Sequence, residues 1–167
     1  MGALTDLTSL VRRKCPGIMD IIMLDALADS YRDFCTKSEF LTKTMTATSA
    51  DKTAPVTITP PADHTVLKVE SVFTTNTSGR SIELYLNDDY TRPKSTELLF
   101  NKPHDEVTIT YVEIPTAIAD AMTMKVDDDI INRYGDVIAF GAATVLRLMP
   151  AQPWTEAGLA EVYSREF

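Results

Sequence analysis

The spacing of hydrophobic residues changes twice along this chain, and this change constrains the fold more than any other feature. From residue 4 to 37 and again from 127 to 165, hydrophobic residues recur at the three-to-four-residue period of an α-helix. Between them, from residue 38 to 113, hydrophobic and polar residues alternate with the two-residue period of β-strands. The sequence therefore predicts an α+β protein whose helices come from both ends of the chain.

Two helices are predicted in the N-terminal segment. The first is short: Thr5 or Asp6 caps it, and Pro16-Gly17 ends it, because proline disfavours helix in the residue before it. The second begins near Ile18 and continues for about five turns. Its hydrophobic face comprises Leu24, Leu27, Ala28, Tyr31, Phe34 and Cys35, and its acidic face comprises Asp25, Asp29 and Asp33.

The longest predicted helix begins at residues 127–129 and ends near Leu148, and a last helix spans residues 156–166. One hydrophobic stripe follows the long helix: Ile130, Tyr134, Val137, Ile138, Gly141, Val145 and Leu148. Residues 137–146 contain no charge, so we expect this helix to be buried on most sides. Glycine costs about 1 kcal/mol relative to alanine inside a helix, so Gly141 predicts the close approach of another backbone.

The hydrophobic stripes at the two ends of the chain each need a partner. We therefore expect the N- and C-terminal helices to pack as one helical bundle, with an antiparallel β lobe inserted between them. The corresponding domains are residues 1–37 with 115–167, and residues 38–114. Four residues of the long helix are expected to be more than three-quarters buried against the second helix, near Leu27 and Tyr31: Tyr134, Ile138, Gly141 and Val145.

The β lobe is predicted to be a small sandwich or curled sheet of short antiparallel strands. The expected strands are residues 40–48, 56–59, 66–75, 82–86 and 107–113, separated by turns at 60–61, 76–79, 87–89 and 102–103. Threonine is abundant here, and its β-branched side chain suits a half-exposed pleated surface. Two readings stay open for residues 115–126. Met122, Met124 and Val126 alternate like a strand, whereas residues 117–121 fit a helical turn.

Composition excludes several classes of function. The chain has 16 basic and 24 acidic residues and a net charge of −8, which disfavours a phosphate-binding surface for nucleic acid. No uncharged stretch reaches the roughly 20 residues of a membrane span, and the first residues do not form a secretory signal. We expect no membrane partner and synthesis in a reducing cytoplasm. Cys15 and Cys35 are expected to be free thiols, about 25 Å apart if the first two helices pack antiparallel.

Catalytic and metal-binding patterns are missing from the sequence. It has no glycine-rich phosphate loop and no nucleophile elbow. His64 and His104 stand beside aspartates in turn-like contexts, where exposed polar residues are common. Residues 127–129 are three consecutive aspartates, which point in different directions on a helix and fit a capping cluster better than an ion site. The sequence therefore predicts no enzyme, no metal and no organic cofactor.

Two further features leave alternatives open. Arg12, Arg13 and Lys14 lie in the last turn of the first helix, where cations offset the helix dipole, or they dock against an acidic partner. The methionines at 19, 23, 122 and 124 mark either an adaptable interface or gaps filled in a core.

The C-terminal segment carries a resemblance to a known family. Residues 129–150 read DIINRYGDVIAFGAATVLRLMP, followed by Gln152-Pro153-Trp154 and then by Leu159-Ala160-x-x-Tyr163-x-x-x-Phe167. The N-terminal half adds Pro16-Gly17 and residues 27–35, LADSYRDFC. This pattern closely resembles the head-to-tail connector adaptors of tailed bacteriophages, also called head completion or tail tubular adaptor proteins. The region from Lys43 to Lys102 matches no segment of that family.

The resemblance implies a structural virion protein located at the head-to-tail interface. Such adaptors form homo-oligomeric rings, commonly of about 12 copies, beneath the portal protein. The ring extends the channel for DNA ejection and supports the tail or nozzle protein. DNA passes through without specific binding, and the acidic balance of this chain is consistent with a lumen that repels the duplex.

The segment from residue 150 to 167 is expected to face the portal, because it combines large apolar residues with a terminal position. The expected interface residues, toward the portal or a neighbouring subunit, are Arg12, Arg13, Trp154, Tyr163 and Phe167. Trp154 is expected to fix the last helix onto Leu146 and Met149. Phe167 either enters a pocket on a neighbour or folds back on its own core.

Two other readings of the whole chain stay open. One is a tail-completion or stopper protein of the same virion. The other is a small soluble ligand-binding module or enzyme with an unrecognised site.

Overall fold

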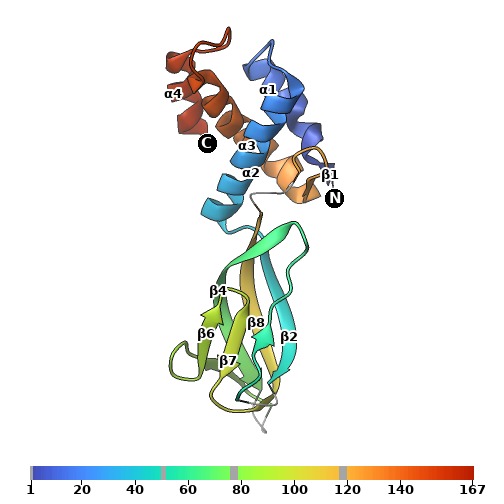
Figure 1. The fold of residues 1–167 in the computed structure, drawn as a ribbon, viewed down its shortest axis with the longest axis vertical. Helices are drawn as coiled ribbons and strands as arrows, with labels where there is room; N and C mark the ends of the chain where they lie inside the picture. The colour runs from blue at the N-terminus through green and yellow to red at the C-terminus, as the bar shows by residue number, and fades with distance from the viewer. Residues whose placement is uncertain (1, 50–51, 76–78, 117–119) are drawn as a thin grey trace. The chain divides into compact units, whose positions relative to one another are not determined.

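Helices and antiparallel sheets share this chain, as the computed structural model in Figure 1 shows, and the predicted α+β class is confirmed. The structure describes residues 2–49, 52–75, 79–116 and 120–167. The chain separates into two compact units, one formed by residues 1–37 and 116–167 and the other by residues 38–115. We call them the helical unit and the β unit.

The helical unit contains a 3-10 turn, η1 (Leu4–Leu7), and the helices α1 (Thr8–Lys14), most of α2 (Asp20–Ser38), α3 (Asp128–Leu148) and α4 (Ala157–Glu166). The two-residue strands β1 (Gly2–Ala3) and β9 (Lys125–Val126) pair antiparallel. Met124 and Val126 are buried, as a strand-like alternation requires, whereas residues 121–123 form a turn. The helical turn considered for residues 117–121 lies partly outside the described residues.

Helix α3 begins with the predicted cap and contacts the other three helices. The Asp127 carboxylate accepts a hydrogen bond from the Asp129 amide at 2.9 Å, so the capping interpretation of the acidic cluster is confirmed. The Ser30 hydroxyl of α2 donates to the Ile138 carbonyl at 2.7 Å. The rings of Phe34 and Tyr134 lie 5.2 Å apart.

The buried face of α3 differs from the predicted stripe. Ile138 and Gly141 are buried as expected and Tyr134 is largely covered, but Val145 is 46% exposed and Leu148 is 58% exposed. The buried face includes Gly135, Ala139, Ala142, Ala143 and Leu146. The prediction for Val145 and Leu148 was wrong because it followed the large side chains, whereas the small ones let the neighbouring elements approach.

Gly141 shows how closely these elements approach. A Cβ atom at this position would overlap the Ser30 hydroxyl and lie 2.7 Å from the Phe167 ring. Glycine is therefore required here by two side chains, those of Ser30 and Phe167. The predicted close approach of a second backbone was wrong. A Cβ at Gly135 would similarly lie 2.8 Å from the Leu7 side chain.

The β unit contains two antiparallel sheets. One has the order β2-β8-β4-β5 and the other the order β3-β7-β6. The strands are β2 (Thr42–Ser49), β3 (Val56–Thr57), β4 (His64–Thr75), β5 (Ser81–Leu84), β6 (Tyr90–Lys94), β7 (Glu97–Phe100) and β8 (His104–Pro115). Five of these overlap the predicted strands. Strands β6 and β7 were missed, because β6 contains Pro93 and its pairing with β7 is irregular between Thr91 and Lys94.

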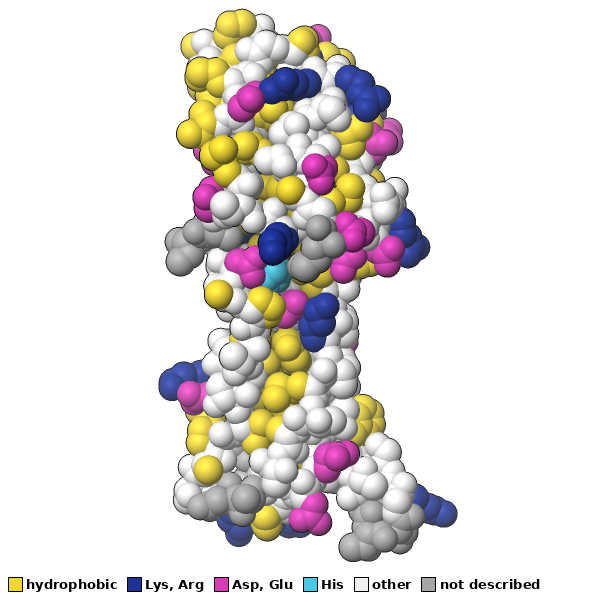
Figure 2. All heavy atoms as spheres, turned by 90° about the vertical axis from the view of Figure 1, so that its right-hand side faces the viewer, with side chains coloured by type: hydrophobic (Ala, Val, Ile, Leu, Met, Phe, Trp, Pro, Cys, Tyr) yellow, Lys and Arg dark blue, Asp and Glu magenta, His cyan; other side chains and the backbone are white. Residues whose placement is uncertain are grey.

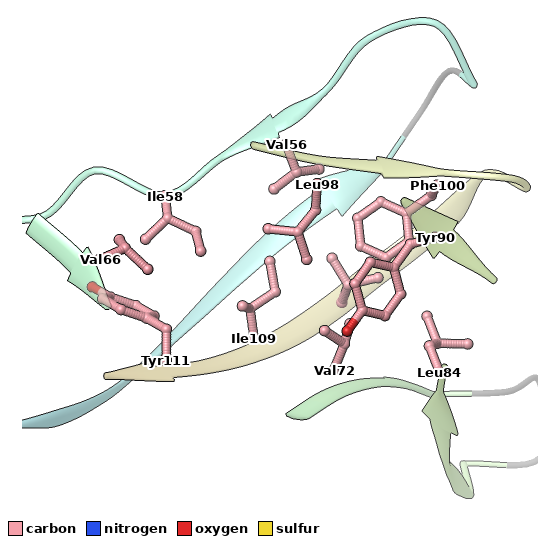
Figure 3. Packing of buried hydrophobic residues seen from close by; sticks show 11 residues of the cluster. Val56, Ile58, Val66, Val72, Leu84, Tyr90, Leu98, Phe100, Ile109 and Tyr111 are labelled. Atoms are coloured by element: carbon pink, nitrogen blue, oxygen red, sulfur yellow. The ribbon is translucent and has the colours of Figure 1, made fainter. Parts of the chain in front are cut away.

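The core of the β unit lies between its two sheets (Figure 3). Side chains from β3, β6 and β7 point toward side chains from β4, β5 and β8 in the figure. The cluster comprises Val56, Ile58, Val66, Val72, Leu84, Tyr90, Leu98, Phe100, Val107, Ile109 and Tyr111. Strand β2 alternates between this core and the surface. Met45 and Ala47 pack against the cluster, whereas the threonines at 44, 46 and 48 are exposed, which agrees with the predicted half-exposed surface.

Candidate interaction surface

Within the described residues, neither histidine is hydrogen-bonded to a serine, threonine or cysteine side chain. His64 begins β4 and His104 begins β8, so the expectation of two exposed turn residues was wrong. The His64 side chain is 8% exposed and its Nδ1 lies 2.9 Å from Asp63 Oδ1. No described Ser, Thr or Cys hydrogen-bonds its other nitrogen. The His104 ring meets the Phe100 ring edge-on, with centroids 5.7 Å apart, which is a packing contact.

Both cysteines are free and buried in the helical unit. Burial raises the pKa of the Cys35 thiol to about 12, against a smaller lowering effect of its hydrogen bond with Tyr31. Burial also raises the pKa of Cys15, partly offset by the charge of Arg147. Both thiols therefore stay protonated at neutral pH and are poor nucleophiles. Among the residues that the structure describes, no cluster of three or more acidic, histidine or cysteine side chains is placed to hold a metal.

The segment between α3 and α4 is fixed to the end of α3. Trp154 is 7% exposed, and its carbonyl accepts a hydrogen bond from Arg147 at 3.1 Å. Arg147 also donates to the Lys14 carbonyl, at the end of α1. The Trp154 side chain is thus buried within the helical unit.

Tyr163 and Phe167 attach α4 to the remaining helices. The Tyr163 ring lies 5.6 Å from the Phe140 ring, and its hydroxyl donates to the Lys14 carbonyl at 3.4 Å. Phe167 is half-buried over Gly141, and the Lys37 ammonium lies 4.8 Å from its ring centroid. The sequence left two positions open for Phe167. In the structure, Phe167 folds back and packs on its own helical unit.

The basic run at the end of α1 divides into three different environments. Arg12 forms an ion pair with Asp20 at the start of α2. Lys14 lies 3.6 Å from the Asp136 carboxylate and 3.9 Å from the Phe140 ring centroid. Arg13 is exposed, and no hydrogen bond or ion pair within the described part of the chain involves it.

A groove of about 340 Å³ lies between α2, α3 and α4. Its lining combines Gly141, Val145 and Phe167 with the polar residues Asp29, Ser30, Asp33, Thr144 and Ser164. We call it the α2–α4 groove. The acidic face of α2 was predicted from the sequence, but its position beside Thr144 and Ser164 was not, because these residues meet only through tertiary packing.

No broad basic surface is visible on the face drawn in Figure 2, where basic and acidic side chains are interspersed. No helix in the described part of the chain is long and apolar enough to cross a membrane. Comparison with models of protein families, and with curated proteins, finds no match to this chain.

Proposed function

We propose that this chain is the adaptor subunit of a phage head-to-tail connector. In this role it forms a ring under the portal, extends the DNA channel and supports the tail or nozzle protein. One observation supports the proposal most: the segments that carry the family resemblance contact one another in the helical unit. Ser30 of the segment 27–35 hydrogen-bonds the Ile138 carbonyl, and Phe167 packs over Gly141. The resemblance thus involves residues that share one packed core.

We further propose that the N- and C-terminal helices act as one helical bundle that carries the inserted β lobe. Its support is the arrangement around α3. Arg147 donates to the last carbonyl of α1, and the Cys15 thiol lies 3.9 Å from the Ala143 carbonyl. The bundle is then the assembly platform, and the β lobe is the part that differs between adaptors.

The charge of the chain suits a conduit rather than a DNA-binding protein. A net charge of −8 in each subunit, repeated around a ring, disfavours tight contact with phosphates. DNA then passes without specific binding. This function needs no active site, metal or cofactor, and it places the mature protein in the virion.

The test is to mix the purified chain with its cognate portal and to image the product by electron microscopy. The proposal expects an added ring of density beneath the portal. Portal rings that remain bare at saturating protein would contradict it. Binding only to a portal that already carries another ring would instead indicate a stopper or tail-completion protein.

A second arm of the experiment examines the C-terminal residues. We expect a variant lacking residues 163–167 to lose ring assembly while its far-UV circular dichroism stays close to that of the full chain. A Phe167→Ala variant separates the aromatic contact from the loss of the helix end. Normal assembly of both variants would remove Phe167 from the interface.

A further inference from the structure

We propose that the α2–α4 groove binds the α1–α2 turn of a second copy of this chain. The α1–α2 turn is defined here as residues 12–21. This inference deepens the proposed function, on which it rests, by naming the two surfaces through which subunits contact each other. The observations that support this contact are the shape and charge of the groove and the exposed residues of the turn.

The groove has an apolar base and an acidic rim. Val145 is 46% exposed and forms the base with Gly141 and the Phe167 ring. Asp29 and Asp33, one turn apart on α2, form the rim, and their side chains are 65% and 47% exposed. A volume of about 340 Å³ accommodates one or two side chains rather than a whole helix.

The rim carboxylates are available to an incoming cation. Asp29 pairs with Arg32 at 3.2 Å and Asp33 with Lys37 at 2.8 Å, each within α2. Both side chains of the Asp33–Lys37 pair are exposed, and such pairs contribute little, because solvent and salt screen them. A guanidinium that binds both carboxylates while its aliphatic stem covers Val145 therefore competes well with the existing partners.

The α1–α2 turn has the complementary chemistry. Arg13 is exposed and has no ion-pair or hydrogen-bond partner within the described residues. Met19 and Ile21 are 61% and 66% exposed, which is unusual for large apolar side chains on one short segment. Gly17, with a φ of 85°, lies in the turn between the two helices, and Arg13 and Met19 lie on either side of it in the sequence.

The turn cannot fill the groove of its own subunit. Asp20, at the end of the turn, and Asp33, at the rim, are 13 positions apart on one continuous helix, which separates them by about 20 Å. An arginine side chain does not span that distance. The occupant must come from another molecule, and a contact between two different surfaces of identical subunits is head-to-tail, the type that generates rings when the rotation closes.

The experiment is a charge swap followed by sedimentation velocity on the full chain without the portal. We expect the wild type to self-associate at high protein concentration in low salt and to dissociate in high salt. Arg13→Glu and the double variant Asp29→Lys/Asp33→Lys should each weaken self-association by about tenfold or more. An equimolar mixture of the two should restore association, because the reversed charges again attract each other.

Arg133→Glu is the matched control, because Arg133 is an exposed arginine of the same unit that lies outside both surfaces. Circular dichroism of each variant verifies that it is folded. A mixture that associates no better than its separate components would overturn the proposal, as would a wild type that stays monomeric throughout. If only Asp29→Lys/Asp33→Lys lost self-association and Arg13→Glu kept it, a segment other than the α1–α2 turn would occupy the groove, which would also overturn the proposal. Ring formation on the portal is measured separately, so the proposed function can hold even if this contact fails.

Discussion

The helical unit and the β unit achieve burial in opposite ways. In the helical unit, α3 is buried largely through small residues, among them Gly135, Gly141 and Ala142, which bring the neighbouring elements into close contact. In the β unit, large side chains such as Phe100 and Ile109 fill the space between two sheets. The core of the helical unit is therefore sensitive to enlargement of its residues, and the core of the β unit to their truncation.

The largest effect is expected from truncation in the β unit. Phe100 is 1% exposed and its ring lies 5.7 Å from the Tyr90 ring. Phe100→Ala leaves a cavity between the sheets and should lower the free energy of unfolding by about 3–5 kcal/mol. Urea denaturation followed by far-UV circular dichroism measures it. Tyr85→Ala is the control, because Tyr85 is 58% exposed and should cost little. Equal losses in the two variants would show that the sheets do not enclose a tight core.

Enlargement in the helical unit should have the next largest effect. Gly141→Leu forces side-chain atoms against Ser30 and Phe167 and should cost about 1–3 kcal/mol. The fluorescence of Trp154, the only tryptophan, reports unfolding of this unit. Gly158→Leu is the matched control, since a Cβ at that position has no neighbour within 4 Å. Unchanged stability of the Gly141 variant would mean that α2 and α4 approach α3 less closely than described.

The pH dependence should be most evident at Cys35 of the helical unit. Its pKa is raised from 9.0 to about 12, so folding favours the protonated thiol. That contribution is present in full below pH 9 and is lost as the pH rises from 9 to about 12, because only the unfolded chain releases the proton. The slope is at most about 1.4 kcal/mol per pH unit. Denaturation at pH 8, 9 and 10 compares the wild type with Cys35→Ala, whose stability should fall less steeply. If the stability of both proteins fell equally with pH, burial would not raise the pKa of the Cys35 thiol, and the thiol would be in contact with water.

The two units also differ in how far their sequence predicts them. In the helical unit the helix ends follow local signals, such as Asp127 and Pro16, and were predicted within a few residues. In the β unit five strands were predicted from alternation, but β6 and β7 were not. Arg92, Pro93 and Lys94 give that hairpin a polar, irregular strand in which alternation is hard to detect.

The groove shows the limit of local patterns more clearly. The acidic spacing on α2 was visible in the sequence, and so was the basic run at residues 12–14. The residues that lie beside these charges in the folded chain could not be predicted, because they are distant in the sequence. Ser30, for example, hydrogen-bonds Ile138, which is 108 positions away. Small residues give no hydrophobic signal, yet they determine which face of α3 is buried and therefore that Val145 lies exposed at the groove.

The smallest effect concerns the start of α3. The Asp127 carboxylate accepts a hydrogen bond from the Asp129 amide, one of the free N–H groups at the start of α3. Asp127→Ala removes this acceptor and a favourable charge near the helix dipole, and should cost about 1 kcal/mol. Asp127→Asn keeps the acceptor and should recover most of the loss. Thermal unfolding followed by Trp154 fluorescence measures both variants at the same pH. If alanine and asparagine destabilise α3 equally, charge rather than capping stabilises this helix start; if neither does, α3 depends on its packing alone.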